Sequence, residues 1–126
     1  MSAKPRLLII EDNPVNLDLV TQLLEDDYEL VTAADGAAGL AAFESHAPAL
    51  CIIDLSLPVM DGWEVIRRIR QAPRRSQTPI IALSAHAHQE DIERALRAGC
   101  DTYLTKPVDE TALLGMIPKL LAKAPR

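Results

Sequence analysis

The feature that most constrains the fold of this chain is a regular alternation of short apolar runs with longer segments of helical periodicity. Each run is too short for a helix and has the length and apolar character of a buried strand. Strands that alternate with helices build a parallel sheet with right-handed crossovers. The sequence therefore predicts an α/β fold with five strands, which are Arg6 to Ile10, Glu29 to Ala33, Leu50 to Ile53, Pro79 to Leu83 and Asp101 to Thr105.

Start and stop signals bound the helices between these strands. Asn13, which precedes a proline, is the predicted N-cap of the first helix. Asp35 and Asp61 are predicted to cap the second and third helices, and Gly99 to end the fourth. The last helix is expected to begin near Asp109. Five helices thus separate and follow the five strands.

The spacing of apolar residues predicts which helix faces meet the sheet. In the first helix the expected inner stripe is Asn16, Leu19, Val20, Leu23 and Leu24. Leu17 falls off that stripe, which makes it a candidate for contact with a partner. In the fourth helix the expected inner face is Ile92, Ala95 and Leu96. Pro118 lies inside the last helix, where a proline removes a hydrogen bond, so we expect a kink or a break there.

Length and composition bound the class of protein. A chain of 126 residues with 48% hydrophobic content fits one domain, residues 1–126 with a core over 6–121. The net charge of -5 argues against nucleic-acid binding. With no signal peptide and no apolar run near the ~20 residues that span a bilayer, we expect a soluble cytoplasmic protein that does not enter a membrane. Cys51 and Cys100 have no metal spacing and are interpreted as reduced, buried thiols.

Chemically useful side chains follow four of the five predicted strands. They are Glu11, Asp12, Asp54, Ser84 and Lys106. In an open parallel sheet ligands bind at the carboxyl ends of the strands, so these groups are expected to converge in one crevice. Asp54, which ends the most apolar strand, is either a reactive carboxylate or a strand-end cap.

The charges of this set predict a partner ion. Two carboxylates about 4 Å apart repel each other by about 4 kcal/mol at an effective dielectric constant near 20. Lys106 neutralises one charge, and a hard divalent ion such as Mg²⁺, which prefers oxygen ligands, would neutralise the rest. A carboxylate nucleophile beside a metal, an ammonium and a hydroxyl is typical of phosphoryl transfer to aspartate. The alternative is a solvated acidic rim.

Together these residues resemble the receiver domain of two-component response regulators. The resemblance covers Arg6 to Leu121 and rests on four pieces, namely Glu11 with Asp12, the segment DLSLPVMDG that begins at Asp54, Ser84 with Ala85, and Lys106 with Pro107. It implies a flavodoxin-like, doubly wound sheet with strand order 2-1-3-4-5. A stand-alone receiver is the expectation, although the chain could equally be a fragment of a hybrid kinase.

The resemblance also implies a role for each site residue. Asp54 would accept the phosphoryl group as an aspartyl phosphate. The Mg²⁺ ligands would be Asp12, Glu11 through water, the Asp54 carboxylate and the backbone carbonyl of Ser56. Lys106 would pair with the phosphoryl oxygens, and its bond to Pro107 would be cis.

A switch is implied as well. Ser84 would move to hydrogen-bond the phosphoryl group, and Tyr103 would change rotamer into the space behind it. The altered surface would be that of the fourth helix, fifth strand and fifth helix. Tyr103 could instead be an ordinary edge-strand tyrosine. Ser56 and His86 match positions that tune hydrolysis of the phosphoryl group, although His86 could simply be an exposed loop residue.

The resulting functional hypothesis is a phosphorylation-switched signalling module. It would receive phosphate from a histidine kinase or a histidine phosphotransfer protein, act on a downstream protein target as a monomer, and lose the phosphate by hydrolysis. It would catalyse only its own phosphorylation and dephosphorylation and would not be an enzyme with a turnover substrate. A constitutive protein-interaction domain is the alternative. A small enzyme or flavin module with the same sheet is less favoured, because Ser56 stands where aspartyl phosphatases need a second Asp and no Gly-rich phosphate loop follows the first strand.

Overall fold

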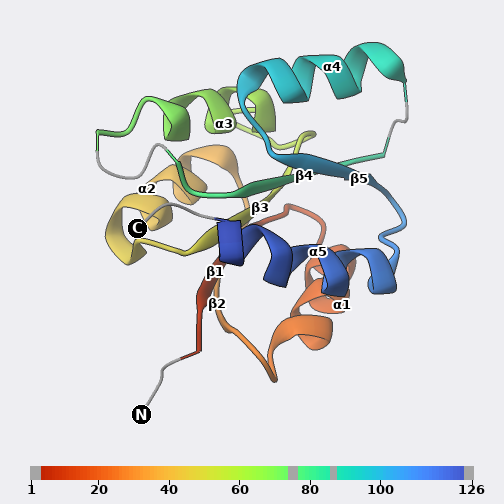
Figure 1. The fold of residues 1–126 in the computed structure, drawn as a ribbon. Coiled ribbons are helices and arrows are strands. Elements are labelled where there is room, and N and C mark those ends of the chain that lie inside the picture. Colours follow the sequence, from red (N-terminus) through yellow and green to blue (C-terminus); the bar gives the residue numbers. More distant parts are fainter. Residues whose placement is uncertain (1–3, 74–76, 86–87, 124–126) are drawn as a thin grey trace.

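The computed structural model describes residues 4–73, 77–85 and 88–123 (Figure 1). The strands are β1 (Arg6–Ile10), β2 (Glu29–Ala33), β3 (Leu50–Asp54), β4 (Ile80–Ser84) and β5 (Thr102–Thr105). The helices are α1 (Pro14–Leu24), α2 (Gly36–His46), α3 (Gly62–Arg70), α4 (Gln89–Ala98) and α5 (Glu110–Lys123). All strand pairs are parallel and the strand order is β2-β1-β3-β4-β5. The predicted fold class and strand order are therefore confirmed.

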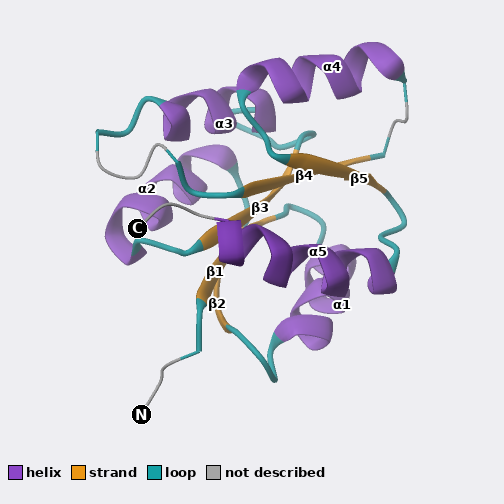
Figure 2. Ribbon diagram, in the orientation of Figure 1, coloured by secondary structure: helices purple, strands orange, loops and turns teal. Residues whose placement is uncertain are grey.

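Helices cover both faces of the sheet, and each face has its own apolar core (Figure 2). On one face α1 and α5 pack against side chains such as Leu7 and Ile9 of β1. On the other face α2, α3 and α4 pack against Leu8 and Ile10 of the same strand. Successive side chains of a strand point to opposite faces, so one apolar run serves both cores. This explains why the central runs are apolar without interruption.

The predicted inner stripe of α1 was wrong in part. Leu19 is 62% exposed, whereas Leu17 packs partly against the core beside the buried Val20 and Leu24. Val20 lies three residues after Leu17 and Leu24 four residues after Val20, which is the spacing of a regular helical stripe. Apolar residues occur nearly all round α1, Val15 among them, so their spacing alone did not select the stripe.

The expected inner face of α4 was wrong at Leu96, and of the kink or break expected in α5 the break is absent. Leu96 is 49% exposed, and α4 contacts the core through Ala95, which is fully buried, and Ala98, which is partly buried. Helix α5 continues through Pro118 to Lys123, so the predicted break does not occur. Pro118 removes the hydrogen bond to the carbonyl of Leu114, but Leu114 is exposed, and water can satisfy that carbonyl.

A close approach at the start of α3 fixes the loop after β3. A Cβ atom on Gly62 would lie 2.6 Å from the Cα of Leu55, so the contact requires glycine. The amide of Gly62 donates to the carbonyl of Leu55 (3.0 Å), and the amide of Leu55 donates to that of Leu83 (2.9 Å). The loop that follows Asp54 is therefore held against the sheet.

The helices that the structure describes include none with the length and apolar character needed to cross a bilayer. The longest of them, α5, has 14 residues.

Candidate functional site

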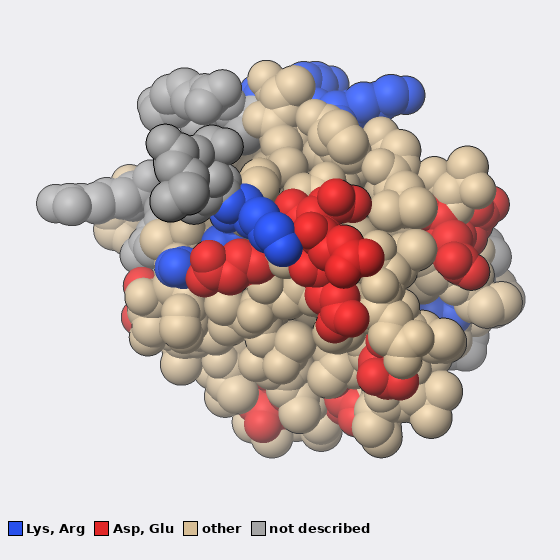
Figure 3. All heavy atoms as spheres, turned by 90° about the horizontal axis from the view of Figure 1, so that it is seen from below, with Lys and Arg blue, Asp and Glu red and all other residues tan. Residues whose placement is uncertain are grey.

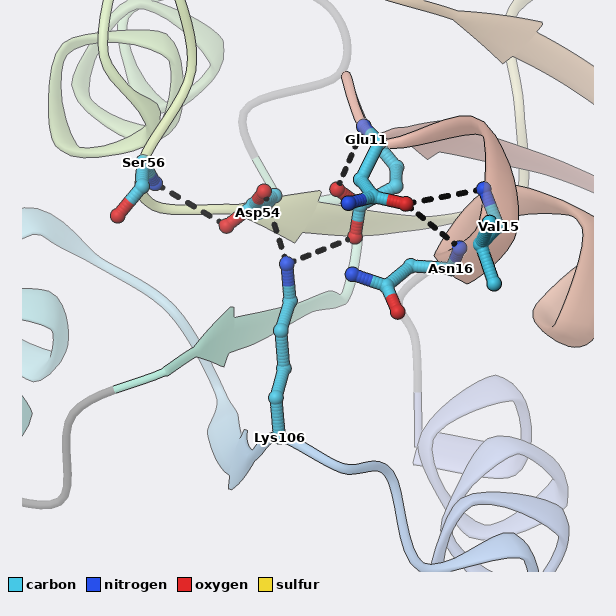
Figure 4. A network of polar contacts seen from close by, with 7 residues as sticks. Glu11, Val15, Asn16, Asp54, Ser56 and Lys106 are labelled. Carbon is cyan, nitrogen blue, oxygen red and sulfur yellow. Dashed lines mark hydrogen bonds and ion pairs between the residues drawn. The ribbon is translucent and has the colours of Figure 1, made fainter.

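Three charged side chains meet at the carboxyl edge of the sheet (Figure 4). Asp54 ends β3 and is 2% exposed, and Glu11 follows β1 and is 1% exposed. The ammonium Nζ of Lys106, which follows β5, lies 3.0 Å from Asp54 Oδ2 and 2.9 Å from Glu11 Oε1. One cation thus bridges two buried carboxylates, as the strand ends predicted.

Strand register explains why these residues meet. Ile10 and Ile53 are paired neighbours on β1 and β3, so the residues that follow them, Glu11 and Asp54, leave the sheet side by side. Strand β5 is separated from β3 by β4. Only a long side chain can cover that distance, and Lys106 does so while keeping an 18% exposed side chain.

The loop between β1 and α1 holds Glu11 in place. Its amide donates to the carbonyl of Ala33 on β2 (3.0 Å), and its Oε2 accepts from the amide of Asn13 (3.2 Å). Asn13 Oδ1 in turn accepts from the amides of Val15 (2.9 Å) and Asn16 (3.1 Å), which confirms it as the N-cap of α1. The capping residue therefore also braces the acidic site, a second role that the capping pattern alone did not indicate.

The two buried carboxylates differ in proton affinity. Burial chiefly raises the pKa of Glu11 to about 7, and the adjacent Asp54 adds to the rise against the lowering effect of Lys106. Burial also acts to raise the pKa of Asp54, but hydrogen bonds with Glu11, the Ser56 amide and Lys106 together hold it below its usual value. The pKa of Lys106 rises, since its two carboxylate partners outweigh burial. Asp54 is consequently the carboxylate that stays ionised.

A cation site is compatible with this arrangement. Glu11, Asp12 and the Asp54 carboxylate each offer an oxygen, and these oxygens lie within 4.8 Å of one another. Glu11 Oε1 is buried and, among the described residues, makes no hydrogen bond, with the ammonium of Lys106 as its ion-pair partner. Asp12 is exposed, so the cluster opens to solvent on that side. Hard oxygen donors of this kind suit Mg²⁺.

The remaining predicted residues lie around this centre. Ser84 ends β4, is 3% exposed, and its carbonyl accepts from the amide of Lys106 (2.8 Å). Ser56 is exposed, and its amide donates to Asp54 Oδ1 (3.1 Å). Tyr103 lies on β5 and packs partly against the core beneath α2, α3 and α4. The peptide bond between Lys106 and Pro107 is cis, as predicted. His86 lies outside the described residues.

Sequence reasoning missed a hollow next to the site. It has a volume of about 470 Å³ and lies between α1 and the segment from Lys106 to Glu110. Glu11 and Lys106 border it at one end, and Leu19 and Leu23 of α1 line its wall. Val15 and Leu19, which are both exposed, lie on this helix. The spacing of apolar residues gave no signal for this surface, because Leu19 was predicted to lie on the buried stripe of α1.

The match to a known family follows these observations. Residues 7–118 match the model of the response regulator receiver domain, so the chain belongs to this family. An uncharacterised 14.6 kDa protein of Leptolyngbya boryana is 40% identical over 116 residues, which are 91% of this chain and 88% of that protein.

Longer proteins contain similar segments. The sensor protein GacS of Pseudomonas syringae pv. syringae is 41% identical over 122 residues, which are 94% of this chain but 14% of GacS. The transcriptional regulator RpaA of Synechocystis is 37% identical over 123 residues, which are 97% of this chain and 51% of RpaA. The chain therefore spans a small part of one relative and about half of the other.

Solved structures share the fold. The receiver domain of the sensor histidine kinase PA1611 of Pseudomonas aeruginosa, with a magnesium ion coordinated in its active site cleft, has a TM-score of 0.89 and 34% identity. That comparison covers 96% of this chain and 100% of the other. A CheY-like receiver domain protein of Methanospirillum hungatei has a TM-score of 0.88 and 33% identity, with 96% of each chain covered.

Proposed function

We propose that this receiver domain is switched by phosphorylation of Asp54. The observation that carries the proposal is the bridging of Asp54 and Glu11 by Lys106, which leaves Asp54 ionised in a buried site. An ionised carboxylate is the reactive form of this nucleophile. An Asp54 oxygen would bond to phosphorus as the bond from phosphorus to the donor's histidine nitrogen breaks, and that nitrogen would leave with the bonding electron pair.

The residues around Asp54 supply the electrostatic part of the reaction. Lys106 lies 3.0 Å from Asp54 Oδ2 and would follow the negative charge onto the phosphoryl oxygens. The amide of Ser56 holds the other Asp54 oxygen, which fixes the orientation of the carboxylate. Ser84, at the end of the neighbouring strand, would donate its hydroxyl to the phosphoryl group.

Mg²⁺ is the proposed cofactor. Asp12 and Asp54 would bind it directly, Glu11 through water, and the backbone carbonyl of Ser56 would complete the protein ligands. The acidic cluster and the magnesium ion of the PA1611 receiver support this assignment. When bound, the ion would neutralise charge on the transferred phosphoryl group. Hydrolysis of the aspartyl phosphate, with Ser56 tuning its rate, would reset the domain.

Phosphorylation would be transmitted through the surface formed by α4, β5 and α5. Movement of Ser84 toward the phosphoryl group would open space that the ring of Tyr103 can fill, since both residues lie on adjacent strands. A downstream protein would recognise the altered surface. We propose that the domain works as a monomer in the cytoplasm.

The phosphate donor is proposed to be a histidine kinase or a histidine phosphotransfer protein. Similar segments in GacS and other sensor kinases support this class of partner. The hollow beside Glu11 and Lys106, with exposed Val15 and Leu19 nearby, offers an apolar surface next to the reacting groups. A donor that docks there would place its phosphohistidine close to Asp54.

The test is intact-protein mass after incubation with acetyl phosphate and Mg²⁺. We expect one phosphoryl adduct that requires Mg²⁺, is lost in Asp54→Ala and persists in Asp18→Ala, a matched carboxylate on the surface of α1. An adduct that survives in Asp54→Ala would contradict the assignment of Asp54. Failure with both acetyl phosphate and a phosphorylated histidine kinase would favour the constitutive interaction domain.

A further inference from the structure

A second hollow lies between α3 and α4, apart from the residues of the candidate phosphorylation site. Its volume is about 290 Å³, and it is lined by Asp61, Trp63, Glu64, Arg67, Arg94, Arg97 and Ala98. The two helices lie side by side on the same face of the sheet (Figure 1). The lining combines one large aromatic ring with three guanidinium groups, which is a composition suited to binding an anion.

Arg94 is oriented by Trp63. Its guanidinium carbon lies 4.0 Å from the centroid of the indole ring, at the distance of a cation–π contact. Stacking occupies the face of the guanidinium but leaves the N–H groups at its edge available to an acceptor. Trp63 and Arg94 come from different helices, so the stack also joins the two walls of the hollow.

Elsewhere in the described chain, arginine side chains have acceptors. Arg70 donates to the carbonyls of Gly99 (2.8 Å) and Thr78 (2.6 Å) and to the Asp101 carboxylate (2.9 Å). Among the described residues, Arg94 and Arg97 make neither an ion pair nor a hydrogen bond. Both border the same hollow, so two guanidinium groups with unused donors face one space.

The carboxylates of the hollow are already engaged. Asp61 accepts from the amide of Glu64 (3.0 Å) as the N-cap of α3. Glu64 pairs with Arg67 through one oxygen and with Arg68 through the other (2.8 Å). The lining holds three guanidinium groups and two carboxylates, so its net charge is +1, whereas the net charge of the whole chain is -5. Figure 3, which views the molecule from below, shows more Asp and Glu than Lys and Arg on that face.

We propose that the α3–α4 hollow binds an acidic segment of a protein partner, with one carboxylate between Arg94 and Arg97. A single carboxylate matches the net charge of the lining, whereas a phosphate dianion would be repelled by Asp61 and Glu64. Trp63 and Ala98 offer apolar surface to the side chains beside that carboxylate. The hollow is open between two helices, which suits a stretch of peptide. This site does not depend on phosphorylation of Asp54.

Trp63 is the single tryptophan of the chain, so its indole N–H gives one isolated NMR signal. The full chain would be titrated at low salt with the peptide acetyl-Ala-Leu-Glu-Leu-Ala-amide and with its Gln counterpart. We expect a saturable shift of the indole signal with the Glu peptide and affinity at least about tenfold lower for the Gln peptide. Arg97→Gln should cause a similar loss. Lys119→Gln, the same charge change on α5, should cause none.

The Glu peptide should bind Asp54→Ala as it binds the unmodified chain. This result would support the α3–α4 site whether or not Asp54 is phosphorylated. Equal shifts with the Glu and Gln peptides would overturn the proposal, as would affinity unchanged by Arg97→Gln or no saturable shift with the Glu peptide. Inorganic phosphate would be titrated in parallel. A tighter response to phosphate than to the Glu peptide would identify a phosphate site and also overturn the proposal.

Discussion

Two polar clusters at opposite edges of the sheet use a cationic side chain in contrasting ways. At the edge where β4 and β5 begin, Arg70 donates to two carbonyls and to Asp101, which also accepts from the amide of Ile80 (2.8 Å). At the carboxyl edge, Lys106 is the cation beside a cluster of three carboxylates. The first cluster pairs its cation with one carboxylate and two carbonyls, whereas the second keeps excess negative charge.

The difference separates a structural cluster from the cluster that is proposed to react. The hydrogen bonds of the first cluster stabilise the joint between α3, β4 and the end of α4. Excess buried charge destabilises the fold locally but favours binding of a cation, and in the proposed function it would keep a carboxylate ionised for nucleophilic attack. Mutations should therefore have opposite effects on stability in the two clusters.

The largest expected effect is that of Arg70→Ala. This change leaves the buried Thr78 carbonyl, the Gly99 carbonyl and Asp101 without their common donor, so the free energy of unfolding should fall by about 2–4 kcal/mol. Urea unfolding measures the loss. Arg68→Ala, which breaks a surface pair with Glu64, is the control and should change stability by less than about 0.5 kcal/mol. An equally small effect of Arg70→Ala on stability would contradict the proposed contrast between the two clusters.

A smaller effect of opposite sign is expected for Glu11→Gln without divalent ions. The pKa of Glu11 is about 7 in the folded protein against 4.5 ordinarily, so the folded state holds this proton more tightly. Its contribution to stability is then fully present below pH 4.5 and is lost as the pH rises through 7. At pH 8 Glu11→Gln should raise the free energy of unfolding by about 1–3 kcal/mol. Urea unfolding at pH values between 5 and 8 measures this difference, with Glu44→Gln on the surface of α2 as the control. An equal loss of unfolding free energy in Glu11→Gln and Glu44→Gln as the pH rises would contradict the prediction.

The smallest effect concerns Mg²⁺. Millimolar Mg²⁺ should stabilise the unmodified chain by about 1 kcal/mol, because the proposed site exists in the folded acidic cluster and not in the unfolded chain. Asp12→Asn should remove most of this gain, while Asp18→Asn on α1 should keep it. Thermal unfolding with and without the ion measures both. Equal stabilisation of the two variants would place the ion elsewhere.

The positions of the residues at the strand ends were predicted well, because the fold itself sets which edge of the sheet they leave from. Once five parallel strands are assigned, Glu11, Asp54 and Lys106 must leave the same edge, and the structure brings them into contact. The buried stripe of α1 was harder to predict because apolar residues lie nearly all round that helix. Pairwise contacts between distant helices, such as Trp63 with Arg94, depend on packing angles that no local pattern encodes.

The presence of helices on both faces of the sheet has a consequence for assembly. The hollow beside α1 and α5 opens on one face, and the hollow between α3 and α4 opens on the other. A molecule seated in either hollow leaves the other accessible, and the sheet between them keeps the two occupants from touching. If both hollows are occupied as proposed, the domain would hold two different molecules at once.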